Sequence, residues 1–164
     1  MTVPVISVVG WHNAGKTTLI EGLVAALKQR GVRVAVIKHT QGHFELDRPG
    51  SDSWRYMQAG SDVAVLVGTG QLVTIEACAE EPDLAEILAR LPAGIDLVIT
   101  EGFKRAPTPK IEVVRPGYGE GRIAHEGELL ALVYNDGEAA QGERIFGLGE
   151  IDRLVELLAQ RRLI

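Results

Sequence analysis

Apolar and polar positions along the chain form two kinds of pattern. Short runs of mostly β-branched or aliphatic residues, such as residues 3–9 and 97–100, have the length and composition of strands buried on both faces. Between such runs, apolar residues recur at every third or fourth position, as in residues 19–27, which is the spacing of an amphipathic helix. A strand, a helix and a second strand in succession over residues 3–37 predict a right-handed crossover between parallel strands.

The same patterns continue along the chain and predict an α/β fold in a single domain, residues 1–164. We expect a mostly parallel sheet with helices on both faces. Two stretches, residues 66–78 and 111–134, depart from the alternation of strand and helix and are expected to add antiparallel strands. The predicted strands are residues 3–9, 32–37, 63–67, 72–77, 97–100, 111–114 and 129–134, and the predicted helices are residues 17–27, 52–59 (capped by Ser51 or Asp52), 82–91 and 151–158.

A phosphate-binding loop joins the first predicted strand to the first predicted helix. Residues 10–17, Gly-Trp-His-Asn-Ala-Gly-Lys-Thr, match the P-loop pattern in the strand-loop-helix context that it requires. The glycines let the backbone approach phosphate, and the N–H groups at the helix start attract it. Lys16 adds a charge for the terminal phosphates, and the Thr17 hydroxyl suits Mg²⁺. The candidate nucleotide ligands are Gly10, His12, Asn13, Ala14, Gly15, Lys16, Thr17 and Thr18.

Acidic residues stand at both ends of the strand predicted at residues 97–100. In open α/β sheets ligands bind beyond the carboxyl ends of the strands, so Glu101 faces the phosphate-binding loop whereas Asp96 belongs to the opposite rim. Thr17 and Glu101 are therefore the candidate Mg²⁺ ligands, Glu101 directly or through water. Lys16 and Glu101 are also the candidate catalytic residues. The alternative for Glu101 is a solvated acid at a strand end.

The second predicted strand ends at the same edge and brings Lys38 and His39 to the site. The long polar loop that follows, residues 39–50, includes His43. It is interpreted either as a mobile cover over the nucleotide or as a solvated loop. The spacing of its histidines and carboxylates fits no closed zinc site.

Composition limits the partners of the chain. A formal net charge of -5 gives no general attraction to the nucleic-acid backbone. No apolar run in the sequence reaches the length of a membrane span, and the one cysteine, Cys78, fits a reducing compartment. We therefore expect a cytoplasmic protein with no membrane association and no general nucleic-acid binding.

Several segments resemble the molybdopterin-guanine dinucleotide biosynthesis protein B (MobB) family of P-loop proteins. They occur in the family's order over most of the chain, and those outside the phosphate-binding loop are the more specific ones. The segments are residues 8–19 (Val-Val-Gly-Trp-His-Asn-Ala-Gly-Lys-Thr-Thr-Leu), 37–39 (Ile-Lys-His), 47–54 (Asp-Arg-Pro-Gly-Ser-Asp-Ser-Trp), 59–60 (Ala-Gly), 96–104 (Asp-Leu-Val-Ile-Thr-Glu-Gly-Phe-Lys) and 109–111 (Pro-Lys-Ile), with Arg115. The chain departs from the family after the Lys-His pair, where Gln41 and Gly42 stand in place of further histidines.

This resemblance implies a P-loop NTPase fold and a GTP-binding protein with weak GTPase activity that assists molybdenum cofactor maturation. The maturation step attaches a guanine nucleotide to molybdopterin, and a partner nucleotidyltransferase performs the transfer. The resemblance also implies contact with the molybdopterin-type cofactor or with the partner enzyme, and a homodimer.

Basic residues follow Glu101 closely in this acidic chain, namely Lys104, Arg105, Lys110 and Arg115. Such a cluster forms either a second anion site, for example for the pterin phosphate, or a solvated basic edge. The resemblance favours an anion or partner surface, so Lys104 and Lys110 are candidate ligand-binding residues.

Asn135 and Asp136 follow the strand predicted at residues 129–134, again at a carboxyl end. An aspartate there would accept hydrogen bonds from the N1–H and N2–H₂ groups of guanine, which makes both residues candidates for base recognition. The alternative is an Asn-Asp-Gly turn at residues 135–137.

The predicted dimer contact lies in residues 111–134. The mixture of apolar and charged residues at 111–115 is typical of a sheet edge, and two such edges would pair about a twofold axis.

Two other functions share the same phosphate-binding loop. A small-molecule phosphotransferase would need a base and an acceptor pocket, and the sequence shows no clear pattern of lid arginines. A nucleotide-gated metal-delivery GTPase would present a cluster of thiols or histidines, which one cysteine and scattered histidines do not supply.

Overall fold

A computed structural model describes residues 3–40, 47–136, 142 and 144–164. The chain divides into two compact units, the first made of Met1–His39 and Arg90–Ile164 and the second of Thr40–Ala89. A single domain therefore stays a prediction. Among the described residues, no helix has the length and apolar character needed to cross a membrane.

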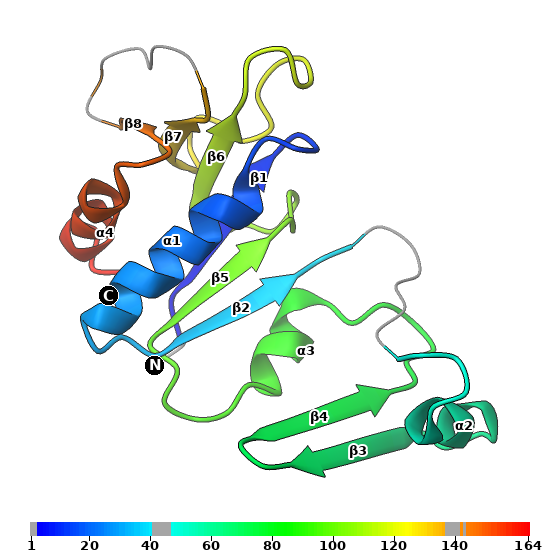
Figure 1. The fold of residues 1–164 in the computed structure, drawn as a ribbon. Helices are drawn as coiled ribbons and strands as arrows, with labels where there is room; N and C mark the ends of the chain where they lie inside the picture. Colours follow the sequence, from blue (N-terminus) through cyan, green and yellow to red (C-terminus); the bar gives the residue numbers. More distant parts are fainter. Residues whose placement is uncertain (1–2, 41–46, 137–141, 143) are drawn as a thin grey trace. The chain divides into compact units, whose positions relative to one another are not determined.

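The described part of the first unit contains a six-stranded sheet, in the order β2-β5-β1-β6-β7-β8, in which every neighbouring pair is parallel (Figure 1). This arrangement confirms the predicted α/β class with its parallel sheet. The strands are β1 (Val5–Gly10), β2 (Val34–Lys38), β5 (Leu97–Glu101), β6 (Lys110–Val114), β7 (Leu129–Tyr134) and β8 (Ile145–Gly147).

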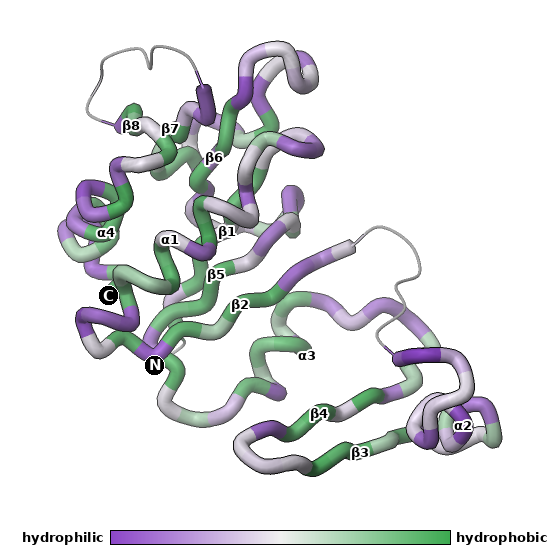
Figure 2. Tube along the Cα trace, viewed as in Figure 1, coloured by the Kyte–Doolittle hydropathy of each residue, from purple (hydrophilic) through white to green (hydrophobic). Residues whose placement is uncertain are grey.

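The carboxyl ends of the central strands meet at one edge of the sheet. Residues Val8 in β1 and Lys38 in β2 are both register partners of Glu101 in β5. Figure 2 shows β1 and β5 as largely hydrophobic strands whose carboxyl ends lead into hydrophilic loops. Because parallel strands end together, this edge gathers polar side chains from distant parts of the chain.

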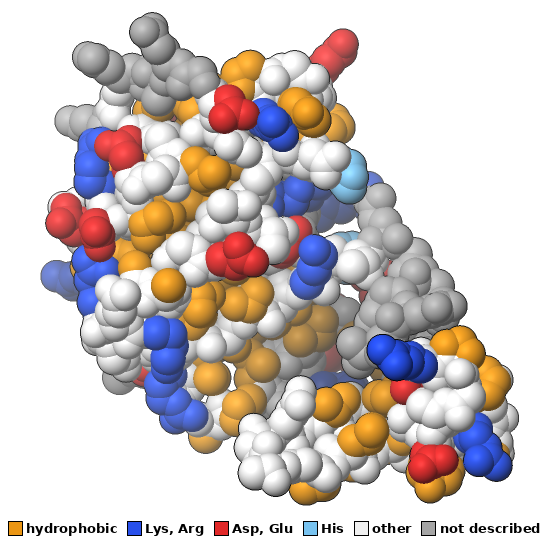
Figure 3. All heavy atoms as spheres, in the orientation of Figure 1, with side chains coloured by type: hydrophobic (Ala, Val, Ile, Leu, Met, Phe, Trp, Pro, Cys, Tyr) orange, Lys and Arg blue, Asp and Glu red, His pale blue; other side chains and the backbone are white. Residues whose placement is uncertain are grey.

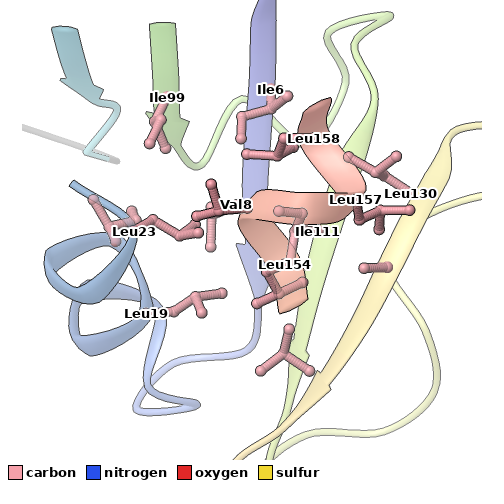
Figure 4. Packing of buried hydrophobic residues seen from close by; sticks show 14 of the residues in the cluster. Ile6, Val8, Leu19, Leu23, Ile99, Ile111, Leu130, Leu154, Leu157 and Leu158 are labelled. Atoms are coloured by element: carbon pink, nitrogen blue, oxygen red, sulfur yellow. The ribbon is translucent and has the colours of Figure 1, made fainter. Parts of the chain in front are cut away.

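Helices α1 (Lys16–Gln29) and α4 (Ile151–Gln160) pack against each other and against one face of the sheet. Their apolar stripes face the strands, and each fully buried leucine contributes about 1.5–3 kcal/mol relative to an exposed one. Figure 4 shows this core at close range, with side chains from α1, α4 and the strands interdigitating. Labelled members are Ile6, Val8, Leu19, Leu23, Ile99, Ile111, Leu130, Leu154, Leu157 and Leu158.

The opposite face of β1, β6 and β7 is covered by the segment between β6 and β7, residues 115–128. Ala124 of this segment packs on Val9 and Leu132. The buried carboxylate of Glu112 accepts hydrogen bonds from the backbone N–H of Ile123 at 2.7 Å and of Ala124 at 3.1 Å. A hydrogen-bonded carboxylate within the sheet therefore holds this segment in place.

The expectation of antiparallel strands in residues 111–134 is wrong. Strands β6 and β7 are parallel, because residues 115–128 return from the carboxyl end of one strand to the start of the next. Within the described sheet, β6 lies between β1 and β7, and β7 lies between β6 and β8. Neither strand has a free edge, so the dimer contact predicted through these edges is wrong as well. The strand β8 was not predicted, since three residues give no readable periodicity.

The second unit contains an antiparallel hairpin of β3 (Val63–Gly68) and β4 (Gln71–Glu76), with α2 (Asp52–Gln58) before it and α3 (Leu84–Ala89) after it. This hairpin confirms the antiparallel addition predicted for residues 66–78. The N-terminus of α2 is capped by Ser51, whose hydroxyl accepts a hydrogen bond from the N–H of Trp54 at 3.2 Å.

Candidate nucleotide and magnesium site

The loop between β1 and α1 has the backbone geometry of a phosphate cradle. Gly10 and Gly15 have φ values of +156° and +104°. A Cβ on Gly10 would lie 2.5 Å from the carbonyl oxygen of Val113, and one on Gly15 would collide with the side-chain amide of Asn135. Gly15 also has no side chain to cap α1, so the N–H groups of the first turn remain for an anion. The cradle therefore fits a phosphate group.

The Lys16 ammonium folds over the same loop. It donates hydrogen bonds to the carbonyl oxygens of Gly10 at 3.2 Å and of Trp11 at 2.8 Å. Burial lowers the pKa of Lys16, the Glu101 carboxylate opposes that shift, and the ammonium groups of Lys104 and Lys38 lower the pKa further. Lys16 thus lies among charged groups from two other segments of the chain, the end of β2 and the end of β5.

A hydroxyl and a carboxylate meet beside the start of α1. The Thr17 hydroxyl lies 3.3 and 3.4 Å from the two carboxylate oxygens of Glu101. The Lys38 ammonium lies 3.3 Å from the same carboxylate, whose side chain is 13% exposed. Oxygen donors of these two kinds are the ligands that Mg²⁺ takes together with phosphates and water, so the pair fits a magnesium ion. Both would hold it, directly or through water.

Asp96, at the other end of β5, accepts a hydrogen bond from the backbone N–H of Arg33 at 2.8 Å. Since Arg33 precedes β2, this carboxylate belongs to the amino-terminal rim of the sheet. Glu101, and not Asp96, lies beside the loop between β1 and α1, where the sequence places it, and its role as a ligand stays a prediction.

Lys104 lies close to the phosphate-binding loop, as the sequence indicates. Its ammonium is 5.4 Å from the centre of the Trp11 ring, a cation–π distance. Trp11 is in turn held by the segment between β6 and β7. Its indole N–H donates to the carbonyl oxygen of Gly121 at 3.1 Å, and Gly119 lies against its ring. Trp11 therefore connects the loop to residues 115–128.

Lys110 does not belong to this site. Its side chain is buried, and its ammonium donates to the carbonyl oxygens of Ala106 at 2.7 Å and Thr108 at 3.3 Å and to the Glu128 carboxylate at 2.8 Å. An ammonium has three N–H donors, and these partners use all of them. The prediction that Lys110 binds a ligand is corrected: at the first residue of β6, it is a structural residue that joins the loop before this strand to Glu128.

Asn135 contacts the phosphate-binding loop directly, and the exposed Asp136 is linked to it through Arg115. The Asn135 amide donates to the carbonyl oxygen of Ala14 at 2.8 Å. Asp136 pairs with Arg115 at 3.3 Å, and Arg115 donates to the carbonyl oxygen of Asn13 at 3.3 Å. These residues brace the loop from the side of β7, and recognition of guanine by Asp136 stays a prediction.

Sequence reasoning missed the part that residues 115–128 play in the site. Arg115 reaches the loop, and its guanidinium stacks on Tyr118 at 4.3 Å. The glycine-rich stretch at 117–121 was a usable signal, because glycines permit close backbone approach to a ring such as that of Trp11.

Other predicted residues have plainer surroundings. His12, Asn13 and Thr18 are exposed on the loop and the first turn of α1, whereas Ala14 is buried. His43 and the other residues at 41–46 lie outside the described residues.

In the described part of the chain, no group of three or more histidine, cysteine, aspartate and glutamate side chains could hold a metal ion. On the face shown in Figure 3, acidic and basic side chains are interspersed.

Comparisons with known proteins converge on one description. Residues 5–135 match the family model of MobB, "Molybdopterin guanine dinucleotide synthesis protein B". A molybdopterin-guanine dinucleotide biosynthesis adapter protein from Haemophilus influenzae is 36% identical over 66% of this chain and 62% of its own length, and one from Escherichia coli is 35% identical over 71% and 69%. A crystal structure of molybdopterin-guanine biosynthesis protein B aligns with a TM-score of 0.72 at 30% identity, over 96% of this chain and 99% of that one.

Proposed function

The chain belongs to the MobB family of molybdopterin guanine dinucleotide synthesis proteins, and from this premise we propose that it binds GTP with Mg²⁺. In this proposal it acts as an adapter for the enzyme that attaches a guanine nucleotide to molybdopterin. The aligned region spans 62% of the length of the Haemophilus influenzae relative. The activity, substrates and partners of this chain are therefore proposals that rest on its own residues.

The observation that carries the nucleotide proposal is the position of Thr17 against Glu101, 3.3 Å apart where the phosphate-binding loop passes into α1. A loop of this sequence holds phosphates through its N–H groups, and a hydroxyl with a nearby strand-end carboxylate is the usual protein contribution to a nucleotide-bound Mg²⁺. When bound, Mg²⁺ supplies charge neutralisation between the terminal phosphates. The chain itself contributes the Lys16 ammonium and the helix N-terminus, which orient the triphosphate.

Weak hydrolysis is part of the proposal. Fast GTPases position an attacking water with a glutamine and stabilise the transition state with an arginine. Arg115 reaches this loop, but it is paired with Asp136 and donates a hydrogen bond to the backbone of Asn13. Because its guanidinium makes these contacts within the protein, it does not serve as the arginine that stabilises the transition state. We propose that binding of GTP, more than its turnover, is the contribution of this chain, and that a partner or substrate raises the rate.

The partners proposed are a nucleotidyltransferase of the same pathway, a molybdopterin-type cofactor and a second copy of this chain. The names of the relatives, which are adapter proteins for this synthesis, support the first two. The homodimer rests on the family resemblance, and with β6 and β7 inside the sheet its contact is proposed elsewhere on the molecule.

Titration of the purified chain with GTP and ATP, each with Mg²⁺, tests the nucleotide proposal. We expect GTP to bind more tightly than ATP, and Lys16→Ala to weaken GTP binding by about tenfold or more because a charged hydrogen bond to phosphate is lost. Lys28→Ala, an exposed lysine in the last turn of α1, is the matched control. Unchanged binding by Lys16→Ala at an equal folded fraction would rule out the site.

The adapter role is tested separately, by adding the chain to the nucleotidyltransferase and molybdopterin and measuring formation of the dinucleotide product. The parent chain is expected to raise that rate, and Lys16→Ala to raise it less. A phosphotransferase would instead transfer the terminal phosphate of GTP to a small acceptor, which thin-layer analysis of labelled nucleotide would reveal.

A further inference from the structure

An excess of positive charge surrounds Glu101 at the phosphate edge of the sheet. The Lys38 ammonium is 3.3 Å from the Glu101 carboxylate, and that carboxylate lies 3.3 Å from the Thr17 hydroxyl. Lys104 stands over the ring of Trp11, and the carbonyl oxygen of Trp11 accepts a hydrogen bond from Lys16. Lys16, Lys38 and Lys104 thus come from three different segments, and Lys38, Lys104 and Glu101 all lie close enough to Lys16 for their charges to act on its pKa. The three ammonium groups and the one carboxylate together carry two net positive charges.

The net positive charge of this group matches a nucleoside triphosphate with Mg²⁺ better than a diphosphate with Mg²⁺. A fully ionised nucleoside triphosphate carries about four negative charges, which one Mg²⁺ reduces to about two, whereas the diphosphate with Mg²⁺ keeps only about one. The excess charge of the lysine group is therefore balanced by the triphosphate and only partly by the diphosphate. Lys16 belongs to the phosphate-binding loop in either state, so Lys38 and Lys104 account for the difference.

The geometry directs the same two side chains toward the terminal phosphate. If Thr17 and Glu101 hold the Mg²⁺ of the nucleotide, the terminal phosphates that this ion neutralises would lie beside Glu101. Lys38 is within contact distance of the carboxylate that would hold this ion, and its own side chain is 56% exposed. With Mg²⁺ at Glu101, the Lys38 ammonium would be repelled from the carboxylate, and the terminal phosphate would offer it a new group of opposite charge. The Lys104 ammonium rests on an exposed ring face, a weak contact that it can leave.

We propose that Lys38 and Lys104 bind the terminal phosphate of the nucleotide and so give this chain its preference for a nucleoside triphosphate over the diphosphate. This inference rests on the proposed binding of GTP and Mg²⁺ and adds two ligands that lie outside the phosphate-binding loop. A protein built in this way distinguishes the nucleotide before hydrolysis from the nucleotide after it by charge.

The test compares a non-hydrolysable GTP analogue with GDP, both with saturating Mg²⁺, by calorimetric titration of the full chain. Lys38→Ala and Lys104→Ala are each expected to weaken binding of the analogue by about tenfold or more and binding of GDP by less than about threefold. Lys16→Ala serves as a reference that weakens both, and Lys28→Ala as a control that changes neither. Circular dichroism checks that the variants have an equal folded fraction. Because the ammonium groups of Lys38 and Lys104 are exposed, we expect both variants to fold like the parent.

Three outcomes overturn the inference. The first is an unchanged ratio of the two affinities in both lysine variants. The second is an equal loss for GDP in Lys38→Ala, which would mean that this lysine acts only through Glu101 and its metal ion. The third is a loss, in both variants, of inorganic phosphate binding to the analogue-loaded chain, which would assign the lysines to a second anion. If the parent chain binds neither nucleotide, the proposed function fails first, and the two failures are thereby separated.

Discussion

The hydroxyl of Thr17 lies 3.3 Å from the carboxylate of Glu101, although 84 residues separate the two in the sequence. Thr17 lies in the first turn of α1 and Glu101 ends β5, and the parallel register Val8↔Glu101 brings these two places together. The contact exists because the ends of β1 and β5 meet. It brings a carboxylate to the phosphate-binding loop, whose own residues, 10–17, include none.

Replacement of Glu101 tests this contact directly. Glu101→Gln keeps the size of the side chain but removes its charge, so the affinity of the GTP-bound chain for Mg²⁺ is expected to fall by about 10–100-fold. Titration of Mg²⁺ at fixed GTP measures this, with Glu156→Gln, an exposed acid of α4, as the control. An unaltered Mg²⁺ requirement would remove Glu101 from the metal site.

The contact between Gly119 and Trp11 predicts a difference between two neighbouring glycines. Both Gly117 and Gly119 have positive φ, +81° and +82°, but only a Cβ on Gly119 would meet the Trp11 ring. Gly117→Ala should therefore cost only the backbone strain, about 1 kcal/mol of unfolding free energy. Gly119→Ala adds a steric clash and should cost at least about 2 kcal/mol.

Urea unfolding measures both variants, and GTP titration shows whether the clash reaches the phosphate-binding loop. We expect weaker GTP binding for Gly119→Ala alone, since Trp11 is part of that loop. Equal stability and equal binding of the two variants would mean that residues 115–128 do not support the loop.

The reassignment of Lys110 predicts that stability, rather than ligand affinity, depends on it. Lys110→Ala leaves two backbone carbonyl groups and the Glu128 carboxylate without their donor, and should lower the free energy of unfolding by about 2–4 kcal/mol. Lys104→Ala, on the exposed ring of Trp11, should change it by less than about 0.5 kcal/mol. The opposite order would return Lys110 to the group of ligand-binding residues.

The same ion pair predicts a dependence of stability on acid. The hydrogen bond from Lys110 lowers the pKa of Glu128 in the folded chain below its ordinary value of 4.5. A carboxyl group with a lowered folded pKa stabilises the protein above the unfolded value, and this contribution is lost as the pH falls through the folded value. Glu128→Gln removes the titration, so its unfolding free energy should fall less steeply than that of the parent below pH 4.5. An equally steep fall of the unfolding free energy in the parent and in Glu128→Gln would contradict this.

Hydrolysis of GTP by the chain alone should be slow, on the order of 10⁻⁴ to 10⁻³ s⁻¹, the range of GTPases without an activating arginine or partner. Release of inorganic phosphate under saturating GTP measures the rate. Addition of the partner nucleotidyltransferase or of molybdopterin is expected to raise it. Turnover of tens per second by the purified chain would contradict the proposal that Arg115 is committed to Asp136 and Asn13.

The sequence by itself determined the features that depend on local spacing. The phosphate-binding loop is recognisable because its glycines, Lys16 and Thr17 stand at fixed intervals between an apolar strand and an amphipathic helix. Glu101 was separable from Asp96 because the direction of a parallel strand decides which end faces the ligand. The hairpin at residues 63–76 followed from two β-branched runs around a turn.

Only the tertiary structure decided what depends on pairing between distant segments. Lys104 and Lys110 are both lysines in the same basic stretch, yet one ammonium stands over Trp11 and the other is buried with Glu128. The order of the strands placed β6 inside the sheet and Asn135 against Ala14, and no local pattern encodes that order. Periodicity along a chain records which face of an element is apolar, whereas neighbours in a sheet are chosen by the packing of the whole, and the surroundings of each charged side chain follow from that choice.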